Sequence, residues 1–238
     1  MFLLTLWLCA LVLAICIAWC TLKPINFGMA AWYPLLNITE KVKEYGPHNR
    51  YRFAFERTTQ EEQYRIYSQI VTAIHNKGKG LNEIIYHLED GTPVDYFLTN
   101  PEALHLKDVS TFISLGKKIG FAHLIIFISG LGYLYFYPIK FPSFKKQCLI
   151  ATLGITIVIT AAVLIGPQTV FYELHNQFFP KDHPWFFYYE DSLMTLLMYA
   201  PYSFAYIASA LGVITFLIII LLLFSLSMIN KVKLGVAV

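Results

Sequence analysis

Charge is scarce in this sequence, because only 14% of its 238 residues are Asp, Glu, Lys or Arg and 57% are hydrophobic. A soluble domain carries roughly 25% charged residues, so this composition lies outside the range of water-soluble proteins. Aromatic residues make up 16% of the chain, which excludes a disordered protein. The composition also excludes a two-domain soluble enzyme and a nucleic-acid-binding protein, so no nucleic acid is expected as a partner.

Cysteine is scarce too, with four residues in the chain. All four lie in stretches without charge: Cys9, Cys16, Cys20 and Cys148. No evenly spaced set of cysteines lies in a polar segment, which excludes a secreted disulfide scaffold and gives no indication of a zinc site.

Four long stretches contain no charged residue at all: residues 1–22, 119–139, 147–172 and 192–230. Each reaches the roughly 20 apolar residues that a helix needs to cross a ~30 Å hydrocarbon layer. The first lacks a basic leader and an Ala-x-Ala-like exit, so we expect a retained anchor and not a signal peptide. The sequence therefore predicts an α-helical polytopic membrane protein with four transmembrane helices.

The charged residues predict the orientation of these spans. All 15 acidic residues lie between spans one and two or between spans three and four. In the loop between spans two and three and in the C-terminal tail, the charged residues are all lysines. The lysines are Lys140, Lys145, Lys146, Lys231 and Lys233. Short loops rich in Lys stay in the cytoplasm. We therefore expect a multi-pass protein of the cytoplasmic (inner) membrane with both termini in the cytoplasm.

This orientation divides the chain into spans, outer segments and inner segments. The predicted segments are transmembrane helix 1 (1–22), an extracytoplasmic domain (23–116), transmembrane helix 2 (117–139), a cytoplasmic loop (140–146), transmembrane helix 3 (147–171), an extracytoplasmic loop (172–200), transmembrane helix 4 (201–229) and a cytoplasmic tail (230–238).

The segment between the first two spans is expected to be a small α+β domain. Alternation of Tyr51, Phe53 and Phe55 is typical of a short strand. Thr58 with Glu61 and Thr59 with Glu62 form overlapping capping-box patterns that predict a helix start. Further expected features are an apolar helix face (Tyr67, Ile70, Val71 and Ile74), a helix end at 77–80, and extended segments near 81–88 and 94–98 joined by a turn at 90–93.

A candidate acid–base pair lies just before the second span. Asn100, Pro101 and Glu102 are typical of a helix start, with Asn100 as the N-cap. His105 then lies in the second turn, and Asp108 follows at i+3 on the same face. Such an acid can accept the proton of one imidazole nitrogen and leave the other nitrogen as a base. The alternative is an amphipathic helix whose His and Asp are merely solvated.

A second histidine, His175, is expected at a similar depth, because its segment continues the third span out of the membrane. Many aromatic residues, including Trp185, lie near it in the sequence. The simpler explanation for these aromatic residues is the aromatic belt that proteins form at the membrane interface. Two histidines at one level among aromatic rings would form an acid–base site facing the lipid head groups. Glu173 would tune this site or be solvated.

Other histidines give weaker signals. His123 lies about one turn inside the second span, and an ionisable group within a membrane is a functional candidate. His183 lies in a proline-containing loop and is expected to be exposed. A metal site built from His105, Asp108, His175 and His183 lacks any tight ligand spacing, so no metal is predicted.

Two sequence blocks carry a resemblance to a known family. The first is Tyr96-Phe97-Leu98 followed by His105-Leu106-Lys107-Asp108-Val109, and the second is Leu174-His175-x-x-Phe178-Phe179 with Trp185-x-Phe187 and Pro201. Together with the four-span layout, they resemble the prokaryotic lipoprotein intramolecular transacylases, the Lit family. Leu174 departs from the aromatic residue expected before the second histidine.

The resemblance implies a specific reaction on a diacylglyceryl lipoprotein in the lipid of the outer leaflet. The sn-2 acyl chain moves onto the α-amino group of the same lipoprotein and gives the lyso-form (N-acyl, S-monoacylglyceryl) product. His105 and His175 correspond to the two essential histidines of the family. Because amine and ester belong to one molecule, no acyl-CoA, metal or other cofactor is required. We assign His105, supported by Asp108, as the base. His175 would then orient the amine or protonate the leaving oxygen, and the two roles are exchangeable.

Two other functions stay open at this stage. One is a serine-dependent lipid acyltransferase or lipase, since Ser110 and Thr111 lie near His105, although no nucleophile-elbow pattern surrounds them. The other is a non-enzymatic transporter or assembly subunit. The absence of acidic residues from the spans argues against transport. The sequence predicts no oligomeric state.

Overall fold

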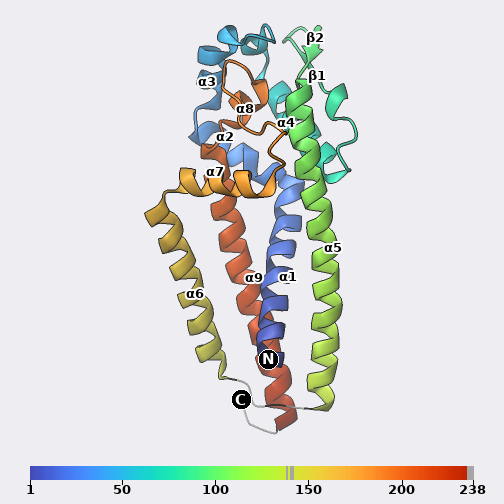
Figure 1. Ribbon diagram of the computed structural model, residues 1–238, viewed down its shortest axis with the longest axis vertical. Coiled ribbons are helices and arrows are strands. Elements are labelled where there is room, and N and C mark those ends of the chain that lie inside the picture. The colour runs from blue at the N-terminus through green and yellow to red at the C-terminus, as the bar shows by residue number, and fades with distance from the viewer. Residues whose placement is uncertain (138, 140–141, 235–238) are drawn as a thin grey trace. The chain divides into compact units, whose positions relative to one another are not determined.

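The computed structural model describes residues 1–137, 139 and 142–234, with side chains up to residue 228. Its helices are α1 (Phe2–Leu22), α2 (Met29–Leu35), α3 (Ile38–Tyr45), α4 (Gln60–His75), α5 (Asn100–Phe136), α6 (Phe144–Ile165), α7 (Pro167–Phe178), α8 (Leu193–Met198) and α9 (Tyr202–Leu234) (Figure 1). Its strands are β1 (Ile85–His87) and β2 (Pro93–Tyr96). Short 3-10 helices occur at Lys23–Gly28, Gly46–His48, Phe55–Arg57 and Leu81–Glu83.

Four helical segments among the described residues are long and apolar enough to cross a membrane. They are Phe2–Leu35, Asn100–Phe136, Phe144–Ile165 and Tyr202–Met228. The prediction of a mainly helical chain with four spans is therefore confirmed. Of the lysines used to predict the orientation, Lys140 and the side chains of Lys231 and Lys233 lie outside the described residues.

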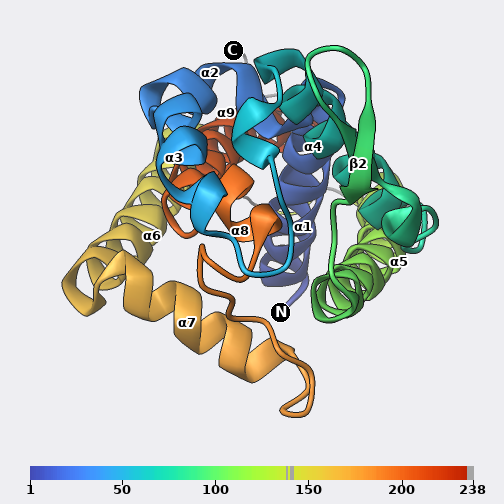
Figure 2. The same cartoon turned by 90° about the horizontal axis from the view of Figure 1, so that it is seen from above.

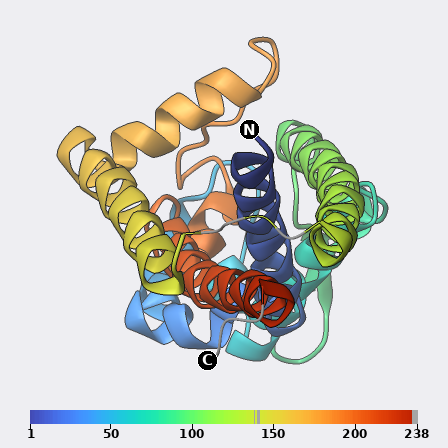
Figure 3. The ribbon, with the colours of Figure 1, turned by 90° about the horizontal axis from the view of Figure 1, so that it is seen from below.

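The chain divides into two compact units. The first unit consists of Met1–Thr21, Gly116–Pro167 and Ser209–Val238, and the second of Leu22–Leu115 and Gln168–Ala208. The first unit therefore holds most of the apolar helical residues, and the second holds the segments in which the acidic residues are concentrated. Figure 3 shows the long helices α1, α5, α6 and α9 from below.

Helices α1, α5 and α9 share an apolar core in the first unit. Leu6 and Ala10 of α1, Leu134 of α5 and Leu226 of α9 are all at most 1% exposed. A side chain at Gly130 would meet Leu6, with a Cβ–Cδ2 distance of 2.3 Å, so this glycine allows α5 to pack closely against α1. At Gly132 and Gly154, by contrast, a Cβ would meet no atom within 4 Å, so these two glycines are not required for close packing.

A polar group also joins helices of the first unit. The Gln147 side chain of α6 is 1% exposed and accepts a hydrogen bond from Trp7 Nε1 of α1 at 3.2 Å. Its Nε2 donates to Ser227 Oγ of α9 and to the Pro142 carbonyl, each at 2.9 Å. A hydrogen bond between apolar helices satisfies polar atoms that lipid leaves unpaired. Gln147 therefore links three helices of this unit.

The second unit has a small aromatic core of its own. Trp32 of α2 packs edge-on against Tyr67 of α4 with ring centroids 5.4 Å apart. Phe55 contacts Tyr86 of β1 at 5.7 Å and Phe97 at 5.5 Å. Strands β1 and β2 form an antiparallel pair, and Figure 2 shows β2 from above. The predicted hairpin near residues 81–98 is confirmed.

The helix start predicted by the overlapping capping boxes is confirmed at Thr59, but the expected strand before it is wrong. Thr59 Oγ1 accepts a hydrogen bond from the Glu62 amide at 3.2 Å and caps the helix. The segment around Phe53 forms no strand and leads into the 3-10 helix Phe55–Arg57. Tyr51 and Phe53 are exposed, and only Phe55 enters the core. A strand needs neighbouring side chains to pack against, and this segment pairs with no strand among the described residues.

The third charge-free stretch is not one helix. Helix α6 ends at Ile165, and α7 starts anew at Pro167. Gly166 between them has φ +95°, which glycine adopts without strain, and Pro167 has no amide hydrogen to continue the α6 ladder. The expectation of one helix over 147–171 that carries His175 outward is therefore wrong, because His175 lies on the separate helix α7.

Candidate functional site

Glu102 anchors the start of α5. The N-cap is Thr99 and not Asn100 as predicted, since the Glu102 carboxylate accepts hydrogen bonds from the Thr99 amide and from Thr99 Oγ1, the latter at 2.6 Å. Its other oxygen accepts from Ser192 Oγ. Ser192 in turn caps α8, because its Oγ accepts from the Thr195 amide at 2.9 Å. The fully buried Glu102 therefore joins two helix starts and has a structural role.

Replacement of Glu102 by alanine is expected to lower the free energy of unfolding by about 2–4 kcal/mol, because it removes the acceptor of three hydrogen bonds from half-buried Thr99 and buried Ser192. Unfolding by denaturant in detergent micelles measures this loss. Glu61→Ala is the matched control, since Glu61 also lies in the first turn of a helix but is exposed. Equal stability of the two variants would contradict the structural role of Glu102.

His105 and His175 meet, as the sequence predicts. His105 lies on α5 and His175 on α7, and their ring centroids are 6.0 Å apart. His105 is 8% exposed, and its Nδ1 has no hydrogen-bond partner within the described part of the chain. The two residues are separated by 70 positions in sequence, so helix packing within the second unit creates the pair.

Aromatic rings enclose the histidine pair. The Phe179 ring lies 4.7 Å from His105 and 5.2 Å from His175. Phe171 and Trp185 lie 4.1 Å and 4.8 Å from His175. Phe187 lies 6.3 Å from His105. These aromatic residues therefore surround the two histidines and do not serve only as an interfacial belt.

The hydrogen bonds of His175 define its tautomer. Its Nδ1 lies 2.8 Å from the carbonyl oxygen of Phe171, and a carbonyl only accepts, so Nδ1 carries the proton. In the neutral ring Nε2 is then an unprotonated acceptor. Burial lowers the pKa of His175, and the bond to the Phe171 carbonyl opposes this effect only in part. His175 therefore has the properties of a general base at neutral pH.

Asp108 does not bond to His105, which corrects the pairing expected from the i,i+3 spacing. Its Oδ2 lies 2.7 Å from Nδ1 of His183. His105 instead faces the rings of Phe179 and Phe187. His183 was expected to be exposed, yet its side chain is only 29% exposed. Helical spacing places Asp108 near His105, but the loop after α7 supplies its partner.

The remaining predicted residues differ in their placement. Trp185 contacts His175, as described above. Glu173 is exposed on α7, and its carboxylate has no hydrogen bond or ion pair with any described residue. His123 belongs to the first unit and shares a 2.8 Å hydrogen bond with the Ile119 carbonyl of its own helix. Within residues 1–137, 139 and 142–234, no group of three His, Cys, Asp or Glu side chains is arranged to hold a metal ion.

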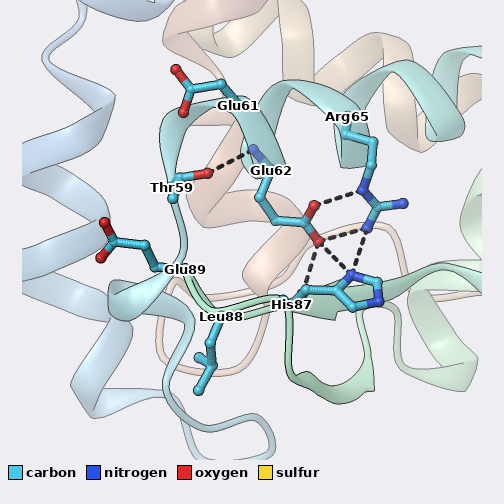
Figure 4. Close-up of a pocket in the computed structure, with 8 residues that line it drawn as sticks. Thr59, Glu61, Glu62, Arg65, His87, Leu88 and Glu89 are labelled. Atoms are coloured by element: carbon cyan, nitrogen blue, oxygen red, sulfur yellow. Dashed lines mark hydrogen bonds and ion pairs between the residues drawn. The ribbon is translucent and has the colours of Figure 1, made fainter.

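A surface pocket of about 480 Å³ lies elsewhere in the second unit and is lined by Glu62, Arg65 and His87 among others (Figure 4). The Glu62 carboxylate accepts from Arg65 Nε and Nη2 at 2.6 Å and from the His87 amide at 2.8 Å. Burial opposes ionisation of Glu62, but these hydrogen bonds outweigh it and lower its pKa. The network ties α4 to β1 and leaves the carboxylate fully engaged, so we assign it a structural role.

Two features of the site have no clear sequence signal. His183 is 75 residues from its partner Asp108, and neither spacing nor periodicity connects the two. The Phe171 carbonyl, which fixes the His175 tautomer, is a backbone atom. A histidine on a helix regularly reaches the carbonyl four residues earlier, so this second feature follows once α7 is known to be helical.

Comparison with known proteins identifies the family and the fold of the chain. The family model described as "Lipoprotein intramolecular transacylase Lit" matches residues 1–204. Three solved structures of the membrane-integral lipoprotein intramolecular transacylase from Bacillus cereus have the same fold. One, with a histidine replaced by arginine, has a TM-score of 0.63 and 17% identity over 99% of this chain and 93% of its own.

A second Bacillus cereus structure has a TM-score of 0.64 and 18% identity over 98% of this chain and 96% of its own. A third, with a histidine replaced by alanine, has a TM-score of 0.64 and 18% identity over 99% and 94%. No curated protein sequence matches the chain. The match over residues 1–204 identifies a membrane-integral acyltransferase: the chain belongs to the lipoprotein intramolecular transacylase (Lit) family.

Proposed function

We propose that this acyltransferase moves the sn-2 acyl chain of a diacylglyceryl-cysteine lipoprotein onto the α-amino group of the same molecule, giving the lyso-form lipoprotein. The observation that carries the proposal is the histidine pair, with His105 and His175 6.0 Å apart among aromatic rings. Attack of an amine on an ester needs proton removal from nitrogen and proton delivery to the leaving oxygen. One histidine takes the proton from nitrogen as a base, and the imidazolium so formed returns a proton to the leaving oxygen, directly or through the second histidine.

His175 is the better candidate for the base. An α-amino group has a pKa near ~7.7–8.0, so a large fraction of it is protonated at neutral pH. The nitrogen attacks the sn-2 carbonyl carbon, its excess proton passes to His175 Nε2, and the acyl–oxygen bond breaks. Donation of Nδ1–H to the Phe171 carbonyl supports this assignment, because it leaves Nε2 free to accept. Without a bond to Asp108, His105 is less suited to the role of base first assigned to it.

His105 is then the group that orients the amine or relays the proton from His175 to the glyceryl sn-2 oxygen as it leaves. Its unpartnered Nδ1 supports this role, since a buried polar atom without a protein partner is free to bond to a substrate. The enclosing rings exclude water, which would hydrolyse the ester instead. Because both reacting groups belong to one molecule, orientation supplies much of the rate enhancement.

The proposed location is the outer leaflet of the cytoplasmic membrane. Residues 23–116 and 172–200 would lie outside, and residues 140–146 and 230–238 would lie in the cytoplasm with both termini. Concentration of all 15 acidic residues in the two outer segments supports this orientation. The mature lipoprotein carries its lipid on the same side, so substrate and histidines would meet at the membrane surface.

Mass spectrometry of lipoprotein N-termini tests the function. In cells that make this protein, we expect an N-acyl chain and a monoacylglyceryl group on the N-terminal cysteine. Unchanged diacylglyceryl groups with a free amine would overturn the proposal. Full activity of Ser110→Ala would exclude this serine as a nucleophile, and the burial of Ser110 together with the Thr111 hydrogen bond to the Lys107 carbonyl favours that result.

The pH profile of the reaction provides a separate prediction. Burial lowers the pKa of His175, so its neutral form persists below pH 6.5. Between about pH 6.5 and 7 we expect the logarithm of kcat/KM to rise with a slope near one, which reflects the substrate amine alone, and to level off above about pH 8. Below the lowered pKa of His175 the slope approaches two. A slope of two that persists above pH 6.5 in a purified assay would contradict the neutral state of His175.

A further inference from the structure

A hydrogen-bonded pair of side chains joins α5 to the loop after α7. This loop, the aromatic loop, consists of residues 179–191. Asp108 Oδ2 of α5 lies 2.7 Å from His183 Nδ1 of the loop, and both side chains are largely shielded, at 18% and 29% exposure. A carboxylate only accepts, so Nδ1 of His183 donates. Partial burial strengthens such a charge-assisted bond.

The aromatic loop carries most of the rings that enclose the two histidines. Phe179 and Phe187 contact His105 at 4.7 Å and 6.3 Å, and Trp185 contacts His175 at 4.8 Å. Much of the loop is irregular, with turns and no strand. Its rings therefore depend on anchors other than a helix or sheet ladder for their positions.

His183 is placed to provide this anchor. It lies between Phe179 and Phe187 in sequence and two residues before Trp185. Among the described residues 179–191, it is the one residue whose side chain hydrogen-bonds to α5. Its partner Asp108 is one helical turn from His105, so the bond fixes the loop against the helix that carries His105.

We propose that Asp108 and His183 are positioning residues for lipoprotein transacylation and hold the aromatic loop over His105 and His175. The inference rests on the proposed function of that histidine pair and deepens it. Neither residue takes part in proton transfer to the substrate. Breaking the bond releases Trp185 and Phe187, which admits water and disorders the bound ester. Since small misplacements of reacting groups lower rates strongly, we expect about a 10-fold to 30-fold loss of rate.

A double-mutant cycle tests this pair. Asp108→Asn, His183→Gln and the double variant are assayed with a synthetic diacylglyceryl lipopeptide in lipid nanodiscs. Each single variant is expected to lose about 10-fold to 30-fold in kcat, and the double variant no more than the worse single one. Asp182→Asn, a change in an exposed neighbouring acid, is the matched control and should retain the wild-type rate. Independent, multiplicative losses would overturn the proposal.

A spectroscopic measurement separates positioning from general stability and from the reaction itself. The chain has four tryptophans, so 5-fluorotryptophan labelling gives four ¹⁹F signals, and Trp185→Phe assigns one of them. Asp108→Asn and His183→Gln should shift or broaden the Trp185 signal and leave the others in place. An unchanged Trp185 signal would overturn the proposal. This measurement requires no turnover, so it tests the positioning role even if the protein does not catalyse transacylation.

Exchange of the two partners provides a rescue experiment. A variant with both Asp108→His and His183→Asp retains a histidine–carboxylate bond with its ends reversed. We expect it to recover at least part of the lost rate and the wild-type Trp185 signal. A swapped variant that folds but performs no better than the single variants in both measurements would contradict the bond as the cause.

Discussion

His175→Gln is expected to lower the rate of transacylation by about 10²-fold to 10⁴-fold, the usual contribution of a positioned general base. Glutamine can still form hydrogen bonds from the position of the ring, but its amide does not accept a proton near neutral pH. The lost function is therefore the proton transfer from the attacking amine. Mass spectrometry of a diacylglyceryl lipopeptide incubated with the purified variant measures the rate of N-acylation.

His48→Gln is a closely matched control for this experiment. His48 Nδ1 lies 2.9 Å from the carbonyl of Glu44 four residues earlier, the same local bond that His175 makes to Phe171. It is exposed, however, and makes no contact with the histidine pair. We expect full activity from this control. A His175→Gln enzyme with a rate within about threefold of wild type would show that the base is another group.

The four membrane spans could be predicted from sequence because charge is costly in lipid and its absence is visible residue by residue. The break between α6 and α7 could not be predicted from the same signal. Gly166 and Pro167 are apolar, so they leave the charge-free stretch intact while they end one helix and start another. Composition identifies the apolar stretches, and the backbone preferences of two residues determine where the helices end.

The site shows a similar division between local and long-range information. Cap residues, tautomers and i,i+4 bonds are local. The α4 cap was narrowed to Thr58 or Thr59, and the α5 cap differed from the prediction by one residue. The partner of Asp108 depends on how the aromatic loop returns to α5. Helical spacing favoured His105, but no local rule contains the contact with His183. Long-range pairs of this kind require the packed structure.

His105→Gln is expected to cost about 10²-fold to 10³-fold in rate, for a reason that differs from the one given for His175. If His105 protonates the departing sn-2 oxygen, the variant loses the acid and keeps the base. Its pH profile should then still show the acid limb of His175. The loss should also depend on the leaving group, because an alkoxide needs a proton and a better leaving group does not.

A lipopeptide with sulfur in place of the sn-2 ester oxygen distinguishes the two histidines. A thiol has a pKa near ~8.5, so it leaves as thiolate without help from an acid. On this thioester, His105→Gln should approach the wild-type rate to within about 10-fold, whereas His175→Gln should stay impaired because the amine still needs a base. Selective rescue of His175→Gln would reverse the two roles. Rescue of neither variant would indicate that His105 orients the amine, the one remaining role that its unpartnered Nδ1 permits.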